Sequence, residues 1–286
     1  MNRFSRIWLV MATVVMLCFT TIATSGATAK PDRSRLWHSC HDMRIVAHRG
    51  VIGPGIDENT LKALRVAAQA KAEVFETDLQ PSVSGTAWDM HDRTVDRTTR
   101  GHGVVGKMTD KQLRGLRTTH GYPVPYDDQL IQFMKNHKAI DGQWELKDFG
   151  WKPSELKALA EKVIAADLED RIAWASSSRW ILLKMAKLAP GMRLEWIGFS
   201  EDLPPLAKFG KKIHQANVLY RAAFRKYAGY ATYIKAAHAR GIDVSVRSTP
   251  VGEGDNPSTW KREINAGVWQ IVTNRLPAYK RWCNAV

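Results

Sequence analysis

Residues 73–79 read EVFETDL, an apolar stretch interrupted by two carboxylates at positions 76 and 78. If this stretch is a strand, Glu76 and Asp78 point to the same side, because side chains alternate between the two faces of a sheet. Two acids on a buried strand are costly unless a positive partner compensates them. The pattern therefore predicts a buried strand that presents both carboxylates to a divalent cation. The alternative is an exposed edge strand with solvated acids.

Strand-like and helix-like segments alternate along the rest of the chain. Strands are predicted at 44–47, 73–79, 87–91, 143–146, 172–175, 193–199, 213–218, 243–246 and 269–272. Helices are predicted at 59–72, 127–137, 153–167, 180–188 and 230–240. Such alternation is typical of α/β proteins with a parallel sheet, and at 286 residues it predicts a single domain folded as an irregular (β/α)8 TIM barrel. Nine strands are predicted where a barrel needs eight, and residues 80–86 are too few for a helical crossover.

The first 29 residues predict a secretory signal peptide. Arg3 and Arg6 supply the basic start, an apolar stretch follows at 7–23, and small residues at 27–29 offer a cleavage site. The alternative is an uncleaved membrane anchor, since the apolar stretch approaches the ~20 residues that a span requires. We expect a secreted, extracellular protein with a polar leader at 30–43 and a barrel domain at 44–286.

Charge and cysteine content agree with export. The formal net charge of +14 favours anionic surroundings, such as a phospholipid surface, a wall polymer, a nucleic acid or a phosphorylated metabolite, without choosing among them. Of the three cysteines, Cys18 lies in the signal. Cys40 and Cys283 are therefore expected to form a disulfide that joins the two ends of the mature chain, and the alternative is two unpaired thiols.

Residues able to move protons and hold an anion follow other predicted strands. Residues 143–147 read QWELK, so Glu145 and Lys147 share one strand face. His48 follows the first strand, and His91 ends the third. A lone histidine at a strand end is more often structural than catalytic. Two at the carboxyl ends of barrel strands favour acid and base roles, because that face of a barrel carries the active site and histidine titrates near neutrality.

Five short motifs occur in a fixed order along the chain. They are H-R-G at 48–50, E-N-T at 58–60, E-T-D at 76–78, H-D at 91–92 and E-L-K at 145–147. In this order and spacing they resemble the signatures of the glycerophosphodiester phosphodiesterase family, and the likeness extends from Ile45 to Pro277. The resemblance implies a phospholipase-C-like TIM barrel that uses a divalent metal, Ca²⁺ or Mg²⁺.

The resemblance also implies a role for each matching residue. Glu76, Asp78 and Glu145 would be the metal ligands, and His48 and His91 would be the acid/base pair. Arg49 and Lys147 would bind the phosphate, and Glu58 would support the site.

Two positions depart from the family's pattern. Residues 244–249 read VSVRST where members often carry a tryptophan-threonine motif, so Arg247 is expected to change the shape or charge of the pocket. Asn274 and Arg275 stand where an acidic residue is common.

We therefore expect a metal-dependent phosphodiesterase that releases glycerol phosphate and an alcohol from small glycerophosphodiesters. A nucleic acid partner is not expected, and the protein is expected to be a monomer. The enzymatic alternatives are a phospholipase D or sphingomyelinase D relative that acts on lysolipids, and a phosphodiesterase of an anionic lipid or a teichoic-acid-type wall polymer. A non-catalytic barrel that binds anionic ligands is disfavoured, because competent residues occupy every motif position.

Overall fold

The computed structural model describes residues 39–198, 214–219, 230–247 and 254–286. All of them belong to one compact unit, Asp32–Val286. The predicted signal at 1–29 and most of the predicted leader at 30–43 lie outside the described residues. Within the four described ranges, no helix has both the length and the apolar character needed to cross a bilayer.

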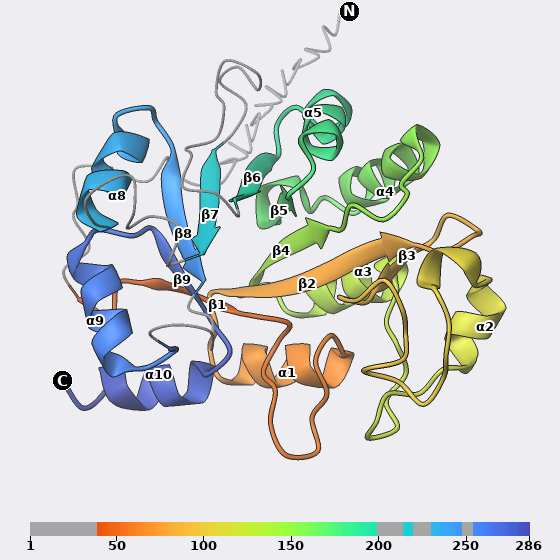
Figure 1. Cartoon of the computed structure of the whole chain (residues 1–286), viewed down its shortest axis with the longest axis horizontal. Helices are drawn as coiled ribbons and strands as arrows, with labels where there is room; N and C mark the ends of the chain where they lie inside the picture. The colour runs from red at the N-terminus through yellow and green to blue at the C-terminus, as the bar shows by residue number, and fades with distance from the viewer. Residues whose placement is uncertain (1–38, 199–213, 220–229, 248–253) are drawn as a thin grey trace, which may run out of the picture. The chain divides into compact units, whose positions relative to one another are not determined.

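Parallel strands form a closed ring at the centre of this unit (Figure 1). They are β1 (Arg44–Ala47), β2 (Val74–Pro81), β4 (Asp141–Leu146), β5 (Ile172–Ser176), β6 (Arg193–Gly198), β7 (Gln215–Leu219), β8 (Asp243–Arg247) and β9 (Gln270–Thr273). Neighbours pair in this order, and β1 pairs with both β2 and β9, which closes the barrel. The predicted barrel is confirmed, and the strand bounds lie within two residues of the predicted ones. Phe199 and Ile213, which the predictions included, lie outside the described residues.

The strand predicted at 87–91 is not part of the ring. Strand β3 (Ala87–Asp89) runs antiparallel to β2, with Leu79 opposite Asp89. A tight turn joins the two strands, in which the N–H of Ser82 donates to the carbonyl of Thr86 at 2.9 Å. The short segment 80–86 is therefore a hairpin connection, which needs no crossover helix.

Helices surround the ring and were predicted only in part. They are α1 (Leu61–Gln69), α2 (Asp110–Gly115), α3 (Asp127–Asn136), α4 (Pro153–Ala165), α5 (Arg179–Leu188), α8 (Tyr230–His238), α9 (Pro257–Asn265) and α10 (Leu276–Cys283), with short 3₁₀ turns η1 (Val105–Lys107) and η2 (Glu169–Arg171). The predictions missed α2, α9 and α10. Helix α9 had a usable start signal, because Asn256 caps it and Pro257 follows at the first helical position.

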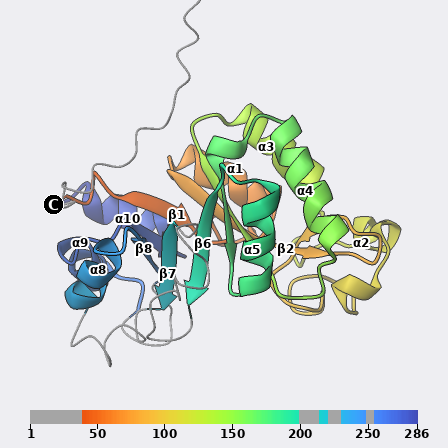
Figure 2. The same cartoon turned by 90° about the horizontal axis from the view of Figure 1, so that it is seen from above.

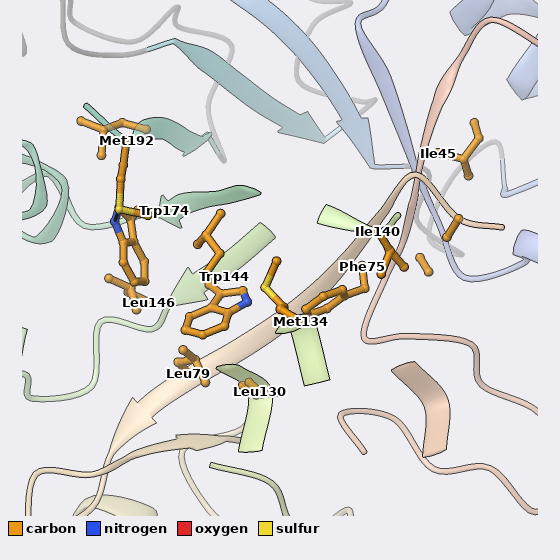
Figure 3. Packing of buried hydrophobic residues seen from close by; sticks show 14 of the residues in the cluster. Ile45, Phe75, Leu79, Leu130, Met134, Ile140, Trp144, Leu146, Trp174 and Met192 are labelled. Atoms are coloured by element: carbon orange, nitrogen blue, oxygen red, sulfur yellow. Dashed lines mark hydrogen bonds between the residues drawn. The ribbon is translucent and has the colours of Figure 1, made fainter. Parts of the chain in front are cut away.

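The main core lies between the outer face of the strands and these helices. On β4, Trp144 and Leu146 are fully buried in this core, and Trp144 meets Trp174 of β5 edge-on with ring centroids 5.8 Å apart. Figure 3 shows Trp144 beside Met134 of α3, with Phe75 of β2 next to it. Because side chains alternate along a strand, this outward packing leaves Glu145 facing the interior of the barrel.

The segment 82–126 is an insertion between β2 and α3 that has a small core of its own. That core consists of Trp88, Met90, Val95, Val105, Leu113 and Val124. Both views place α2 of this insertion far from α8 and α9 (Figures 1 and 2). The N–H of Met90 donates to the carbonyl of Asp78 at 2.7 Å, so the insertion anchors the chain just before His91 to the carboxyl end of β2.

The two ends of the described chain are covalently joined. Cys40 and Cys283 form a disulfide with their Cα atoms 5.6 Å apart, as expected from the cysteine content. The phenol of Tyr279 also donates to the carbonyl of Cys40 at 3.0 Å. The leader is thus attached to α10 beside the point where β1 begins.

Candidate active site

Three carboxylates project from neighbouring strands into the carboxyl end of the barrel. Strands β2 and β4 are parallel and in register, with Asp78 directly beside Glu145. Glu76 and Asp78 are completely buried and Glu145 is 4% exposed. One oxygen of each lies within 4.8 Å of the others. The alternative interpretation of 73–79, an edge strand with solvated acids, is therefore wrong.

These carboxylates fit a divalent cation. Oε1 of Glu76 and Oε2 of Glu145 are buried, and no described residue donates a hydrogen bond to either. Burial and the neighbouring charge of Asp78 raise the pKa of Glu76 well above its usual value. Unsatisfied buried oxygens of this kind are costly unless a positive ligand compensates them, and an all-oxygen donor set suits a hard cation such as Ca²⁺ or Mg²⁺.

Lys147 and Arg49 place positive charge directly against the carboxylates. Nζ of Lys147 lies 2.8 Å from Asp78 Oδ1 and 2.7 Å from Glu145 Oε1. Nε of Arg49 lies 3.3 Å from Asp78 Oδ2. Burial would raise the pKa of Asp78, but Lys147 and Arg49 outweigh it and hold that pKa well below its usual value. Asp78 is therefore ionised, and both cations are engaged by it.

The H-R-G motif owes its form to a left-handed turn at the end of β1. Arg49 has φ of 58° and Gly50 has φ of 79°, a region of backbone conformation that residues other than glycine rarely adopt. This turn directs the N–H of Arg49 to Glu76 Oε2 at 2.9 Å. A Cβ at Gly50 would lie 2.7 Å from the backbone of Ala63 in α1. The glycine is needed so that α1 can pack against the turn.

Each residue of the E-N-T motif makes a different hydrogen bond near the site. Glu58 Oε1 accepts from NH1 of Arg49 at 2.9 Å and from NH2 of Arg97 at 2.7 Å. Nδ2 of Asn59 donates to Asp78 Oδ2 at 2.8 Å. Thr60 caps the start of α1 by accepting from the N–H of Ala63. Glu58 thus positions Arg49 and is not one of the three clustered carboxylates that could hold a metal. Asn59 is a site residue that the predictions did not assign.

His48 is held as a proton acceptor. Its Nδ1 lies 2.6 Å from Oδ1 of Asn274, at the end of β9. An amide oxygen only accepts, so Nδ1 carries the hydrogen and Nε2 presents a lone pair. Nε2 lies 3.8 Å from Glu76 Oε2 and receives no hydrogen bond from the described residues. Burial, followed by the charges of Arg247 and Arg49, lowers the pKa of His48 well below its usual value, so the ring is neutral at pH 7.

His91 is more accessible and is oriented by a different partner. Its side chain is 31% exposed, and Nδ1 lies 2.7 Å from Oδ1 of Asp92. Arg97 holds Asp92 through Nε at 2.6 Å, and its hydrogen bond is the largest cause that lowers the pKa of Asp92 to about 2. A continuous polar chain therefore runs from His91 through Arg97 and Glu58 to Arg49.

The structure brings every predicted site residue to the carboxyl end of the barrel, and it adds several that the motifs left without a role. These are Asn59, Asp92, Arg97, Arg247 and Asn274. Asn59 and Asp92 lie inside quoted motifs, and Arg97 follows closely. Asn274 is separated from His48 by 226 positions, so their contact depends on closure of the barrel.

The sequence model of the glycerophosphoryl diester phosphodiesterase family matches residues 48–276. A glycerophosphodiester phosphodiesterase of Caldanaerobacter subterraneus subsp. tengcongensis is 28% identical over 161 residues, which make up 52% of this chain and 64% of that protein. The match thus spans somewhat less than two thirds of that relative's length.

Solved structures share the fold. A glycerophosphodiester phosphodiesterase from Parabacteroides distasonis superimposes with a TM-score of 0.71 at 19% identity, covering 85% of this chain and 97% of that one. A phosphodiesterase from Oleispira antarctica, solved in complex with the product sn-glycerol-3-phosphate, gives a TM-score of 0.69 at 16% identity and covers 87% of this chain and all of that one.

Proposed function

The chain belongs to the glycerophosphoryl diester phosphodiesterase family, and from this membership we propose that it hydrolyses glycerophosphodiesters to glycerol phosphate and an alcohol. The observation that carries the proposal is the convergence of two histidines, three buried carboxylates and two cations at one end of the barrel. The product bound to the Oleispira antarctica relative supports the same reaction class.

His48 is the proposed base. Its neutral ring directs Nε2 towards the carboxylates and away from Asn274, so Nε2 can accept a proton from the attacking hydroxyl. That hydroxyl belongs either to water, which gives glycerol phosphate directly, or to the glycerol of the substrate, which gives a cyclic phosphate that water then opens to glycerol phosphate. A bond forms between its oxygen and phosphorus while the bond from phosphorus to the alcohol oxygen breaks. Proton transfer of this kind contributes about 10²–10⁴-fold to a rate.

His91 is the proposed acid. Asp92 holds its Nδ1 at 2.7 Å, which fixes the ring and leaves Nε2 to deliver a proton to the departing alcohol oxygen. Its partial exposure, 31% of the side chain, suits a residue that meets a leaving group at the mouth of the barrel.

Glu76, Asp78 and Glu145 are the proposed ligands of Ca²⁺ or Mg²⁺. When bound, such a cation would polarise the phosphodiester and offset the charge that develops on its oxygens. Lys147 and Arg49 hold Asp78 ionised, which keeps the ligand set ready for a cation. They also bring positive charge to the place where the phosphate binds.

The reaction can be tested by the release of glycerol 3-phosphate from glycerophosphocholine, with Ca²⁺, Mg²⁺ or EDTA. We expect metal-dependent turnover that falls by at least about 10²-fold in His48→Ala. His102→Ala is the matched control, because the His102 side chain is 90% exposed and its hydrogen bond within the described residues is to Asp96, outside the site. Absence of turnover with either metal, or equal activity in His48→Ala and the control, would contradict the proposal.

A cleft beside the site favours a second candidate substrate. A cavity of about 530 Å³ lies between the insertion and the start of α4, and its lining includes Gln80, Arg93, Lys107 and Asp148. Within the described part of the chain, Arg93 and Lys107 form no side-chain ion pair or hydrogen bond. Gln80 and Asp148 lie just beyond Asp78 and Lys147, so the cleft adjoins the carboxyl ends of β2 and β4.

These two cations would suit a further phosphate of an anionic polymer such as a teichoic acid. Such a substrate is favoured if Arg93→Gln with Lys107→Gln slows release of glycerol phosphate from the polymer but leaves glycerophosphocholine hydrolysis unchanged. Equal effects on both substrates would remove this candidate.

We also propose that residues 1–29 direct export. The support is the basic start, the apolar stretch and the small residues at 27–29. Amino-terminal sequencing of the protein recovered outside expressing cells should begin at Lys30. A protein that stays inside the cells with Met1 intact would contradict export.

A further inference from the structure

Arg247 stands on the opposite side of the barrel from β4, the strand that carries Glu145. It is the last residue of β8, and β8 is separated from β4 by three strands in either direction round the ring. Ser245, two residues earlier, hydrogen-bonds to Gln270 inside the barrel, and alternation places Arg247 on the same inner face. Its NH2 reaches to 3.6 Å from Oε2 of Glu145. The guanidinium therefore extends across the mouth of the site.

This guanidinium has N–H donors that no described residue accepts from. Its side chain is only 11% exposed, and Nε and NH2 are buried with no acceptor from the described residues at hydrogen-bond distance. An ionised donor left unmatched in a buried position is destabilising unless a ligand satisfies it. Arginine's fixed fork of N–H groups matches the oxygens of a phosphate.

The other two cations of the site are already engaged. Lys147 contacts both Asp78 and Glu145 at less than 3 Å. Arg49 donates to Glu58 through NH1 and lies against Asp78 through Nε. If either of them bound the phosphate with the same atoms, it would give up a carboxylate that it now neutralises.

We propose that Arg247 is a phosphate-binding residue of this enzyme, in addition to Arg49 and Lys147. This inference rests on the proposed function for its substrate and extends the set of residues that recognise it. The competing role for Arg247 is that of a counter-charge to Glu145 alone. In that case it would affect the binding of a cation but not of a phosphate.

Calorimetric titration with inorganic phosphate and with sn-glycerol 3-phosphate, in Ca²⁺ and in EDTA, separates the two roles. We expect Arg247→Gln to weaken the binding of both probes on the order of 10- to 100-fold, the range for charge-assisted hydrogen bonds. Arg247→Lys should recover part of the affinity, because it keeps the charge and loses the fork. Arg240→Gln is the control, since Arg240 is exposed and lies before β8 begins.

Unchanged phosphate affinity in Arg247→Gln, with tighter Ca²⁺ binding, would overturn the inference in favour of the counter-charge. Wild-type protein that binds neither probe would overturn it as well. The test is independent of turnover: phosphate binding that depends on Arg247, in a protein that cleaves no glycerophosphodiester, would refute the proposed reaction and uphold the binding role. Thermal unfolding of Arg247→Gln and Arg247→Lys verifies that each variant is folded.

Discussion

Replacing Gly50 by alanine should destabilise the fold at the point where the active site is built. The residue has φ of 79°, and an added Cβ would lie 2.7 Å from both the carbonyl carbon and the Cβ of Ala63. Ala63 is fully buried in α1, so it cannot move aside without moving the helix. The substitution therefore combines an unfavourable backbone conformation with an overlap in a packed region.

The two contributions can be separated. The left-handed conformation costs about 1–2 kcal/mol for a residue with a Cβ, and an overlap in a well-packed core costs about 1–3 kcal/mol. Gly50→Ala should thus lower the free energy of unfolding by about 2–5 kcal/mol. Gly121→Ala is a matched control, because Gly121 has φ of 88° and nothing lies within 4 Å of its added Cβ. It should lose only the conformational part, about 1–2 kcal/mol.

Thermal and urea unfolding, followed by circular dichroism, measure both variants. For a domain of this size about 2–4 °C are lost per kcal/mol. Gly50→Ala should also lose turnover under conditions where it is still folded, because the turn that directs the N–H of Arg49 to Glu76 is displaced. Equal losses of stability in the two variants would show that the contact with Ala63 has no energetic role. A loss below about 1 kcal/mol at Gly50 would refute the reasoning as a whole.

Three further outcomes are expected. Glu76→Gln should raise the thermal midpoint of metal-free protein, since it removes a carboxylate whose pKa burial has raised. The same variant should no longer gain thermal stability when Ca²⁺ is added. A Ca²⁺-dependent rise of the midpoint that persists in Glu76→Gln would exclude Glu76 as a ligand. Asp92 has its pKa lowered to about 2, so its contribution to stability is present above its unfolded pKa of ~3.9 and is lost as the pH falls through 2. Asp92→Asn should cost at most about 2.6 kcal/mol at pH 7, by 1.36 kcal/mol per pKa unit, and less because solvent screens this partly exposed group. The difference from wild type should vanish near pH 2 in urea titrations, and a constant difference would contradict this. The double variant Cys40→Ser, Cys283→Ser should lower the free energy of unfolding by up to about 5 kcal/mol, from loss of a long closed loop. A urea-unfolding midpoint equal to that of the oxidised wild type would exclude a stabilising disulfide.

Several features of this chain follow from local sequence because their causes are local. The alternation of outward Trp144 with inward Glu145 needs only the two-residue period of a strand. The i, i+2 spacing of Glu76 and Asp78 predicted two acids on one buried face, and both are fully buried there. The short length of 80–86 indicated that no crossover helix fits, and β3 proves to be antiparallel to β2.

Other features depend on contacts between distant parts of the chain. Glu58 was expected to support the site, and only the packing of the insertion shows that it joins Arg49 to Arg97. Arg247 was expected to alter the pocket, but its unmatched donors became visible only when β8 was placed opposite β4.

By itself, the sequence determined which segments are strands and which residues are the candidates for the chemistry, since periodicity and motif order are properties of neighbouring residues. Only the tertiary structure decided how those residues are paired. Barrel closure brings Asn274, directly after β9, to His48, directly after β1, across 226 positions and so sets which nitrogen of the ring carries its hydrogen. Hydrogen bonds and charge interactions of this kind act over a few ångströms in space, and no spacing along the chain records that distance.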